Sequence, residues 1–167
     1  MAIGDFQVVG ISAPHRMRVA ASVTRGYAGE PVIWTGSLTS GVASDNTVVV
    51  ATDNTSVIAT DSFVGVLNKN MVVSSAGTVL AHPTVVSRPI PNATKIRGKL
   101  KTASTGDTES EIIGLLFDIY AIDLTSSVYT WAPAAADTHG FTVIDGNPTR
   151  STVDCIVDAR VLRADIS

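Results

Sequence analysis

The 167-residue sequence is poor in charged side chains, which make up 16% of it, well below the roughly 25% that is usual in soluble domains. Its formal net charge is only −3, so no global field would hold it on nucleic acid or on an anionic membrane. The longest apolar runs, such as Ile112 to Phe117, are far shorter than the about 20 residues that a spanning helix needs. We therefore expect neither a nucleic-acid partner nor a membrane partner.

Cysteine is almost missing. Cys155 stands alone, so no internal disulfide can form, and we expect its thiol to be a buried apolar group. The residues from Met1 to Phe6 lack the positively charged start and the apolar run of a secretory signal. We expect the protein to stay where it is made or to leave the cell by lysis.

Motifs for catalysis and for metal binding are missing as well. The histidines His15, His82 and His139 stand apart from one another among Pro, Gly and small residues, without a nucleophile or a second ligand at a recognised spacing. The sequence contains no glycine-rich phosphate loop and no Gly-x-Ser-x-Gly elbow. It predicts no enzyme activity, no catalytic residue, no cofactor and no metal site.

What the sequence has in abundance is Val, Ile, Ser and Thr, a composition that favours strands over helices. Turn signals recur about every 8–12 residues, which is typical of a sandwich or barrel. The predicted fold class is all-β: a β-sandwich or barrel of short, mainly antiparallel strands with extended loops or arms. Strands are expected at Phe6–Ile11, Met17–Thr24, Pro31–Thr35, Thr47–Thr52, Ser56–Thr60, Phe63–Leu67, Thr78–His82, Lys95–Lys101, Glu111–Leu124, Tyr129–Trp131, Phe141–Ile144 and Thr152–Leu162.

Two of these strands differ in how clear their pattern is. In Thr152–Leu162, Val153, Cys155 and Val157 alternate with other residues, which predicts one buried face. In Glu111–Leu124 the apolar spacing also fits a helical stripe, whereas a glycine and several β-branched residues favour a strand. We expect a strand there and keep the helix as the alternative.

The length of the chain favours a single β-rich domain over residues 1–167. Pro89 and Pro91 interrupt the segment from Ser87 to Asn92, because proline blocks both a helix and a regular ladder. We expect a stiff, extended connector there, which would divide the domain into subregions 1–88 and 92–167.

The clearest charge pattern follows this connector. Cations alternate from Lys95 to Lys101, which places them on one face of a strand, and carboxylates alternate from Asp107 to Glu111. A hairpin folded about Ser104 would make a ladder of opposite charges on the solvent side. The expected pairs are Lys101 with Asp107, Lys99 with Glu109 and Arg97 with Glu111.

The alternative is that cations dock on an acidic partner. Lys95 and Arg97 are the candidates from the alternating strand, and a separate acid-free cluster consists of His15, Arg16, Arg18 and Arg25. The predicted partner interface is Arg16, Arg18, Arg25, Lys95 and Arg97.

Three short segments resemble the head decoration (cement) proteins of tailed bacteriophages. They are Gly26–Trp34, Phe63–Leu67 and Gly77–Leu80, and the likeness ends at about Lys101. The resemblance implies a structural virion protein, made in the host cytoplasm, that binds the outer capsid surface and stabilises contacts between capsomers. Its implied partners are the major capsid protein and further copies of the chain, in a homotrimer.

Two other functions stay open at this point. One is a phage tail-tube or fibre-associated structural protein, which would also be rich in strands. The other is a small carbohydrate-binding module, because aromatic rings can stack on sugars. The rings available for that purpose are Tyr27, Trp34, Tyr129 and Trp131.

Overall fold

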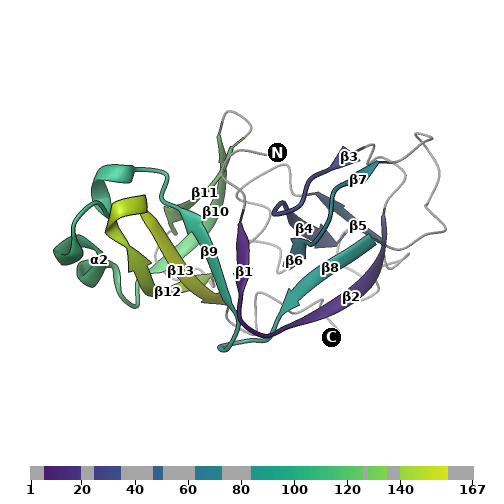
Figure 1. The fold of residues 1–167 in the computed structure, drawn as a ribbon, viewed down its shortest axis with the longest axis horizontal. Coiled ribbons are helices and arrows are strands. Elements are labelled where there is room, and N and C mark those ends of the chain that lie inside the picture. Colours follow the sequence, from purple (N-terminus) through teal and green to yellow (C-terminus); the bar gives the residue numbers. More distant parts are fainter. Residues whose placement is uncertain are drawn as a thin grey trace.

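A computed structural model of the chain describes residues 6–19, 25–34, 47–50, 63–72, 84–125, 128–134 and 140–157. Most of these residues lie in strands, which form a six-stranded sheet, a closed barrel and a two-stranded ribbon (Figure 1). Nearly all strand pairs are antiparallel. The predicted all-β fold class is therefore confirmed.

The barrel is closed by five short strands. β2 pairs with β5 in parallel, and the other neighbouring pairs are antiparallel. A Cβ atom at Gly65 would clash with the backbone oxygen of Ser87, so glycine allows β6 and β8 to approach closely. In order around the barrel, the strands are β2 (Ser12–Val19), β5 (Thr47–Val50), β4 (Pro31–Trp34), β6 (Phe63–Leu67) and β8 (Thr84–Pro89).

The six-stranded sheet combines the first described strand with the last five. β1 precedes the barrel in the sequence but pairs with β9, so the chain passes from the sheet into the barrel and back (Figure 1). In spatial order the strands are β1 (Gln7–Val9), β9 (Lys95–Lys99), β13 (Thr152–Val157), β12 (Phe141–Asn147), β10 (Ile119–Thr125) and β11 (Val128–Pro133). A separate ribbon pairs β3 (Arg25–Gly26) with β7 (Met71–Val72).

One core joins the barrel and the sheet. Phe63 of β6 meets Phe141 of β12 edge-on, with ring centroids 5.1 Å apart. Trp131 of β11 lies between Phe141 and Phe6, at centroid distances of 4.8 and 4.6 Å. All four rings are buried, so this aromatic chain belongs to a single hydrophobic cluster.

A helix replaces the first part of the predicted strand Glu111–Leu124. α2 covers Glu109–Leu115, and only the second part is a strand, β10. Thr108 and Glu111 form a capping box, in which each side chain binds the other residue's backbone N–H. Up to Leu115 the strand prediction was wrong and the helical alternative was right, because this cap and the burial of Ile112 outweigh the β-branched composition. From Ile119 the strand prediction is confirmed.

The segment from Ser87 to Asn92 is not a stiff, extended connector. Its first residues belong to β8, where Ser87 pairs with Pro14 and Pro89 with Ser12. The following residues turn back, because the N–H groups of Ala93 and Thr94 both donate to the carbonyl oxygen of Ile90. Proline at the last position of a strand is compatible with this ladder.

The other predicted strands agree with the structure to different extents. Phe63–Leu67 is confirmed end to end as β6. β2 begins at Ser12, five residues before the predicted Met17. β1, β4, β5, β9, β11, β12 and β13 overlap their predicted ranges, whereas β3, β7 and β8 were not predicted. The predicted strands Ser56–Thr60 and Thr78–His82 lie outside the described residues.

Two short 3-10 helices complete the described part, η2 (Ala103–Thr105) and η3 (Pro148–Arg150). Among the helices described, none is long and apolar enough to cross a membrane.

Candidate functional site

The outer face of the six-stranded sheet is polar across four strands. On β9, Ile96 and Gly98 are buried, while Lys95, Arg97 and Lys99 alternate with them on the other face. Residues that face each other across paired strands project to the same side of a sheet. One row therefore contains Gln7, Arg97, Asp154 and Asp145, and the next contains Lys99, Thr152 and Asn147.

Ion pairs neutralise two of the cations on this face. Arg97 donates two hydrogen bonds to the carboxylate of Asp154, at 2.7 and 2.8 Å, and this hydrogen-bonded charge raises the pKa of Arg97. The Asp154 side chain is almost completely buried, so this pair is partly shielded from water. Lys95 lies 3.5 Å from Asp145 in a more exposed pair.

The predicted hairpin and its charge ladder are wrong. Arg97 pairs with Asp154 on β13, and Lys101 donates to Asp123 on β10 at 2.8 Å. Of the carboxylates expected opposite them, Asp107 precedes the cap of α2, and Glu111 lies in its first turn and accepts from the Thr108 hydroxyl at 2.9 Å. The true partners are separated from β9 by up to 57 residues, so local alternation could not identify them.

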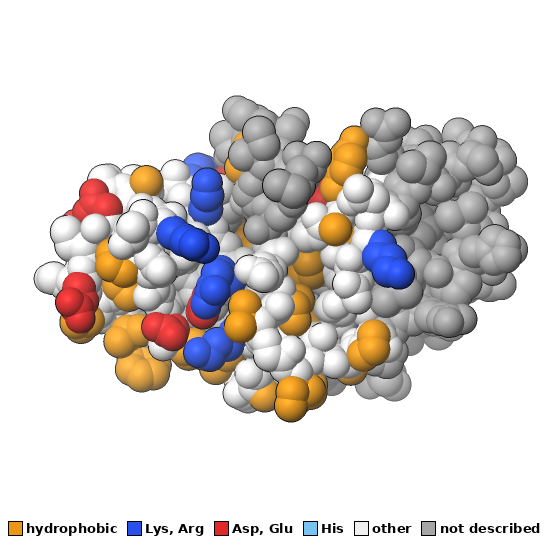
Figure 2. Space-filling model, in the orientation of Figure 1, with side chains coloured by type: hydrophobic (Ala, Val, Ile, Leu, Met, Phe, Trp, Pro, Cys, Tyr) orange, Lys and Arg blue, Asp and Glu red, His pale blue; other side chains and the backbone are white. Residues whose placement is uncertain are grey.

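A depression of about 550 Å³ opens on the same face; we call it the basic depression. Two of its cations, Lys99 and Arg150, form no ion pair with any described residue. Figure 2 shows Lys and Arg side chains gathered in a band over this part of the molecule. The lining residues are Gln7, Arg97, Gly98, Lys99, Thr149, Arg150 and Thr152.

The η3 turn brings Arg150 beside β9. Asn147 caps this turn, because its side-chain oxygen accepts from the N–H of Arg150 at 3.3 Å, and Pro148 supplies a suitable first residue. Ser151 then takes a left-handed conformation, and its carbonyl oxygen accepts from the N–H of Leu100 at 2.9 Å. These bonds fix the turn against the end of β9.

Thr152 contributes an unusual hydroxyl to the basic depression. Thr152 is the cross-strand partner of Lys99, and the residue is 8% exposed. Its Oγ1 atom is buried and has no hydrogen-bond partner within the described structure. Buried hydroxyls are normally hydrogen-bonded, so the hydrogen-bonding capacity of this one is unmet beside the basic depression.

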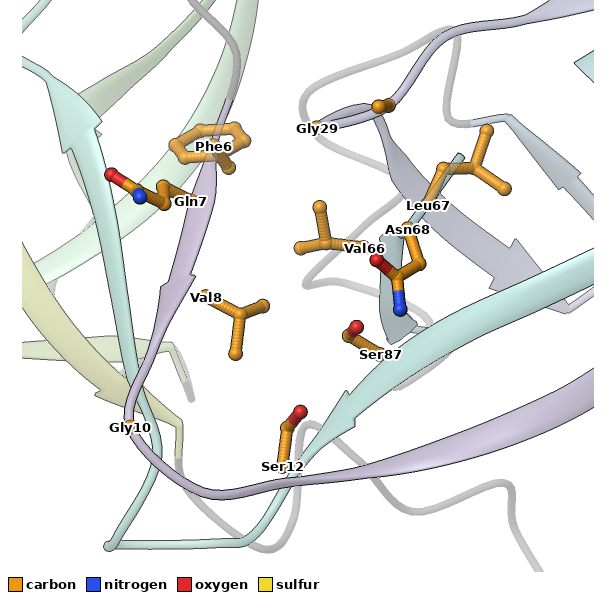
Figure 3. A pocket seen from close by; sticks show the side chains of 11 residues that line it. Phe6, Gln7, Val8, Gly10, Ser12, Gly29, Val66, Leu67, Asn68 and Ser87 are labelled. Carbon is orange, nitrogen blue, oxygen red and sulfur yellow. The ribbon is translucent and has the colours of Figure 1, made fainter. Parts of the chain in front are cut away.

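A second depression, of about 260 Å³, lies between β1 and the barrel (Figure 3); we call it the junction cleft. Apolar side chains of Phe6, Val8 and Val66 line it together with the polar groups of Ser12 and Ser87. Gln7 of β1 belongs to the lining of both the junction cleft and the basic depression. None of the described residues that line the junction cleft is charged.

Large apolar side chains are exposed where α2 leads into β10; we call Ile113, Phe117 and Ile119 the apolar corner. Their exposed fractions are 60%, 77% and 38%. Phe117 also has a φ of 72°, in the left-handed region that a bulky residue rarely adopts. Its N–H donates to the carbonyl oxygen of Val143 at 2.8 Å, which holds the backbone in place.

The five residues of the predicted partner interface lie in three different sheets. Arg16 and Arg18 belong to β2 of the barrel, Arg25 to β3 of the ribbon, and Lys95 and Arg97 to β9. The side chains of Arg16, Arg18 and Arg25 lie outside the described residues. Lys95 and Arg97 are on one face, as alternation predicted.

Arg150 was missed because no sequence pattern links it to Lys99. Its place depends on the η3 turn and on the pairing of β13 with β9. The Asn147-Pro148 dipeptide is a turn signal that could have located η3, although not the strand beside it.

The aromatic rings proposed for sugar stacking are not available as one platform. Trp131 and Tyr129 are buried in the core, where they cannot offer a face to a ligand.

Cys155 is buried as predicted, and burial raises the pKa of its thiol. In the described ranges, no three His, Cys, Asp or Glu residues are grouped so that they could hold a metal ion.

Comparisons with protein-family models, with curated proteins and with solved structures found no match for this chain.

Proposed function

We propose that this chain is a non-catalytic structural protein of the virion that binds the outer surface of a phage head and stabilises contacts between capsomers. Its partners in this proposal are the major capsid protein and further copies of the chain, as a homotrimer. The proposal is supported by the resemblance of Gly26–Trp34 and Phe63–Leu67 to decoration proteins, and by the all-β fold.

The observation that carries the proposal is the apolar corner. Ile113, Phe117 and Ile119 lie within seven residues of one another and are all exposed. Neighbouring apolar side chains on a surface mark sites of protein–protein contact, and an aromatic side chain is a common anchor in such contacts. The space-filling view shows apolar side chains gathered below α2, at the lower left (Figure 2).

The backbone of Phe117 strengthens this argument. A left-handed conformation costs an L-residue about 1–2 kcal/mol, and the exposed ring recovers little of that cost by packing within the chain. Strained residues of this kind cluster at functional sites, where the strain places a side chain for a partner. The strain at Phe117 is consistent with a ring that is held out for contact.

The test is co-sedimentation with phage heads that lack the protein. We expect the wild-type chain to bind, and Ile113→Ser combined with Phe117→Gly to bind at least about tenfold more weakly, a change of about 1.4 kcal/mol. Ile11→Ser is the matched control, because Ile11 is also exposed but lies outside the apolar corner. Equal binding by all three proteins would refute the role of the corner, and failure of the wild type to bind would refute the function.

Light scattering on the free protein tests the assembly. A stable trimer is the expected result. Rings or filaments would instead support a tail-tube or fibre component, and would overturn the decoration role.

A further inference from the structure

We propose that the basic depression binds a carboxylate side chain carried by an acidic segment of the protein partner. This inference rests on the proposed function, since the partner there is the major capsid protein, and it adds the chemistry by which that partner is recognised. The residues that would contact the carboxylate are Lys99, Arg150 and Thr152.

The charge balance of the sheet face supports an anionic ligand. Arg97 and Lys95 already have carboxylate partners, whereas Lys99 and Arg150 have no ion-pair partner among the described residues. Two positive charges therefore remain uncompensated in one hollow of a protein whose net charge is −3. An arginine and a lysine together can supply charge-assisted hydrogen bonds to both oxygens of a carboxylate.

The Thr152 hydroxyl supports the same conclusion independently of charge. Thr152 lines the hollow and is the cross-strand partner of Lys99, and its buried Oγ1 atom has no hydrogen-bond partner in the described structure. A hydroxyl can donate to a carboxylate oxygen that is held by the two cations. Such a ligand would satisfy a buried polar group that is otherwise costly.

The surroundings favour a polypeptide over a free phosphate ion. Phosphate sites in proteins use several converging backbone N–H groups at a helix N-terminus or a glycine-rich loop, and η3 has only three residues. Gln7 of β1 lines both the basic depression and the junction cleft, and that cleft has apolar side chains from Phe6, Val8 and Val66 (Figure 3). An extended segment could place its acidic residue in the first hollow and a neutral neighbour in the second.

The first experiment is calorimetric titration of the full chain with an acetylated and amidated hexaglutamate peptide. We expect binding that weakens as the salt concentration rises from roughly 50 to 300 mM, because screening reduces the attraction. Lys99→Gln with Arg150→Gln should weaken it at least about tenfold, about 1.4 kcal/mol. Lys69→Gln is the matched control, since Lys69 is exposed but lies outside both hollows.

Two further arms make the assignment specific. Thr152→Val removes the hydroxyl while keeping the branched shape, and we expect a two- to fivefold loss of peptide affinity, about 0.4–1 kcal/mol. A hexaglutamine peptide should not bind. Equal affinity for hexaglutamate in the double variant, or tighter binding of inorganic phosphate than of the peptide, would overturn the proposal.

Measuring how the wild type and the variant bind phage heads distinguishes this inference from the proposed function. If the wild type binds heads and the Lys99→Gln, Arg150→Gln variant binds them equally well, the inference fails and the function stands. If the wild type binds hexaglutamate but no heads, the function fails and the carboxylate chemistry of the basic depression stands.

Discussion

At the scale of the residue, Phe117 combines an exposed ring with a backbone conformation that favours glycine. Phe117→Gly relieves a left-handed strain of about 1–2 kcal/mol. The greater conformational freedom of glycine in the unfolded chain offsets about 0.5–1 kcal/mol of this gain in stability. We expect a net gain in the free energy of unfolding of about 0.5–1 kcal/mol. Urea denaturation measures it.

Phe117→Ala is the control for this change, because it removes the ring but keeps the Cβ atom that causes the strain. We expect Phe117→Ala to gain nothing. A glycine variant that is less stable than the alanine variant would show that the conformation at Phe117 is not strained.

The two ion pairs on β9 should differ in their contribution to stability. Arg97→Met leaves the buried Asp154 carboxylate without its partner, and we expect a loss of about 1–3 kcal/mol in the free energy of unfolding. Lys95→Met breaks a more exposed pair and should cost no more than about 1 kcal/mol. Thermal unfolding of the two variants measures the difference.

A double variant shows where the loss arises. Adding Asp154→Asn to Arg97→Met removes the unpaired charge, so we expect it to restore part of the lost stability. If Arg97→Met and Lys95→Met cost the same, the pair of Arg97 with Asp154 adds no more to stability than the exposed pair of Lys95 with Asp145.

At the scale of the element, substitutions at Thr108 test how much the capping box stabilises α2. Thr108→Ala removes the hydroxyl that accepts from the N–H of Glu111, and we expect a loss of about 1 kcal/mol. Thr108→Ser keeps the oxygen and should cost much less. Denaturant unfolding compares the two, and equal losses would mean that the methyl group, rather than the cap, stabilises α2.

The same cap gives α2 a dependence on pH. Hydrogen bonds from the Thr108 hydroxyl and from the backbone N–H of Asp107 favour the ionised Glu111 carboxylate and lower its pKa, while the contact with Glu111 raises the pKa of the Asp107 carboxyl. A lowered pKa means that the ionised carboxylate stabilises the folded state at neutral pH, and that this contribution is lost as the pH falls through the folded-state pKa. We expect wild type and Glu111→Gln to converge in stability on acidification.

Elements with a local signal could be predicted, and those that depend on distant partners could not. β6 was located because its apolar run is bounded by turn residues. α2 was predicted only as the alternative to a strand, although Thr108-x-x-Glu111 before an apolar run is a capping box. Of the candidate site, Lys95, Arg97 and Lys99 could be placed on one face, but Asp154 and Arg150 join them only through the pairing of β13.

At the scale of the whole molecule, the core decides whether the barrel and the sheet fold together. The chain enters the barrel from β1 and returns to β9, so the sheet needs a strand from each side of the barrel in the sequence. The ring of Phe6 packs on Trp131 and would clash with any Cβ atom at Gly98. Phe63 of the barrel packs against Phe141 of the sheet in the same cluster.

We therefore expect one cooperative unfolding transition, with equal calorimetric and van't Hoff enthalpies. Phe6→Ala should lower the free energy of unfolding by about 3–5 kcal/mol, since it opens a cavity in the shared core. Hydrogen exchange then tests the coupling: amides of β6 in the barrel and of β13 in the sheet should lose protection by the same amount, because both open only when the core opens. Loss of protection in β13 alone, or two separate calorimetric transitions, would show that the barrel is stable without the sheet.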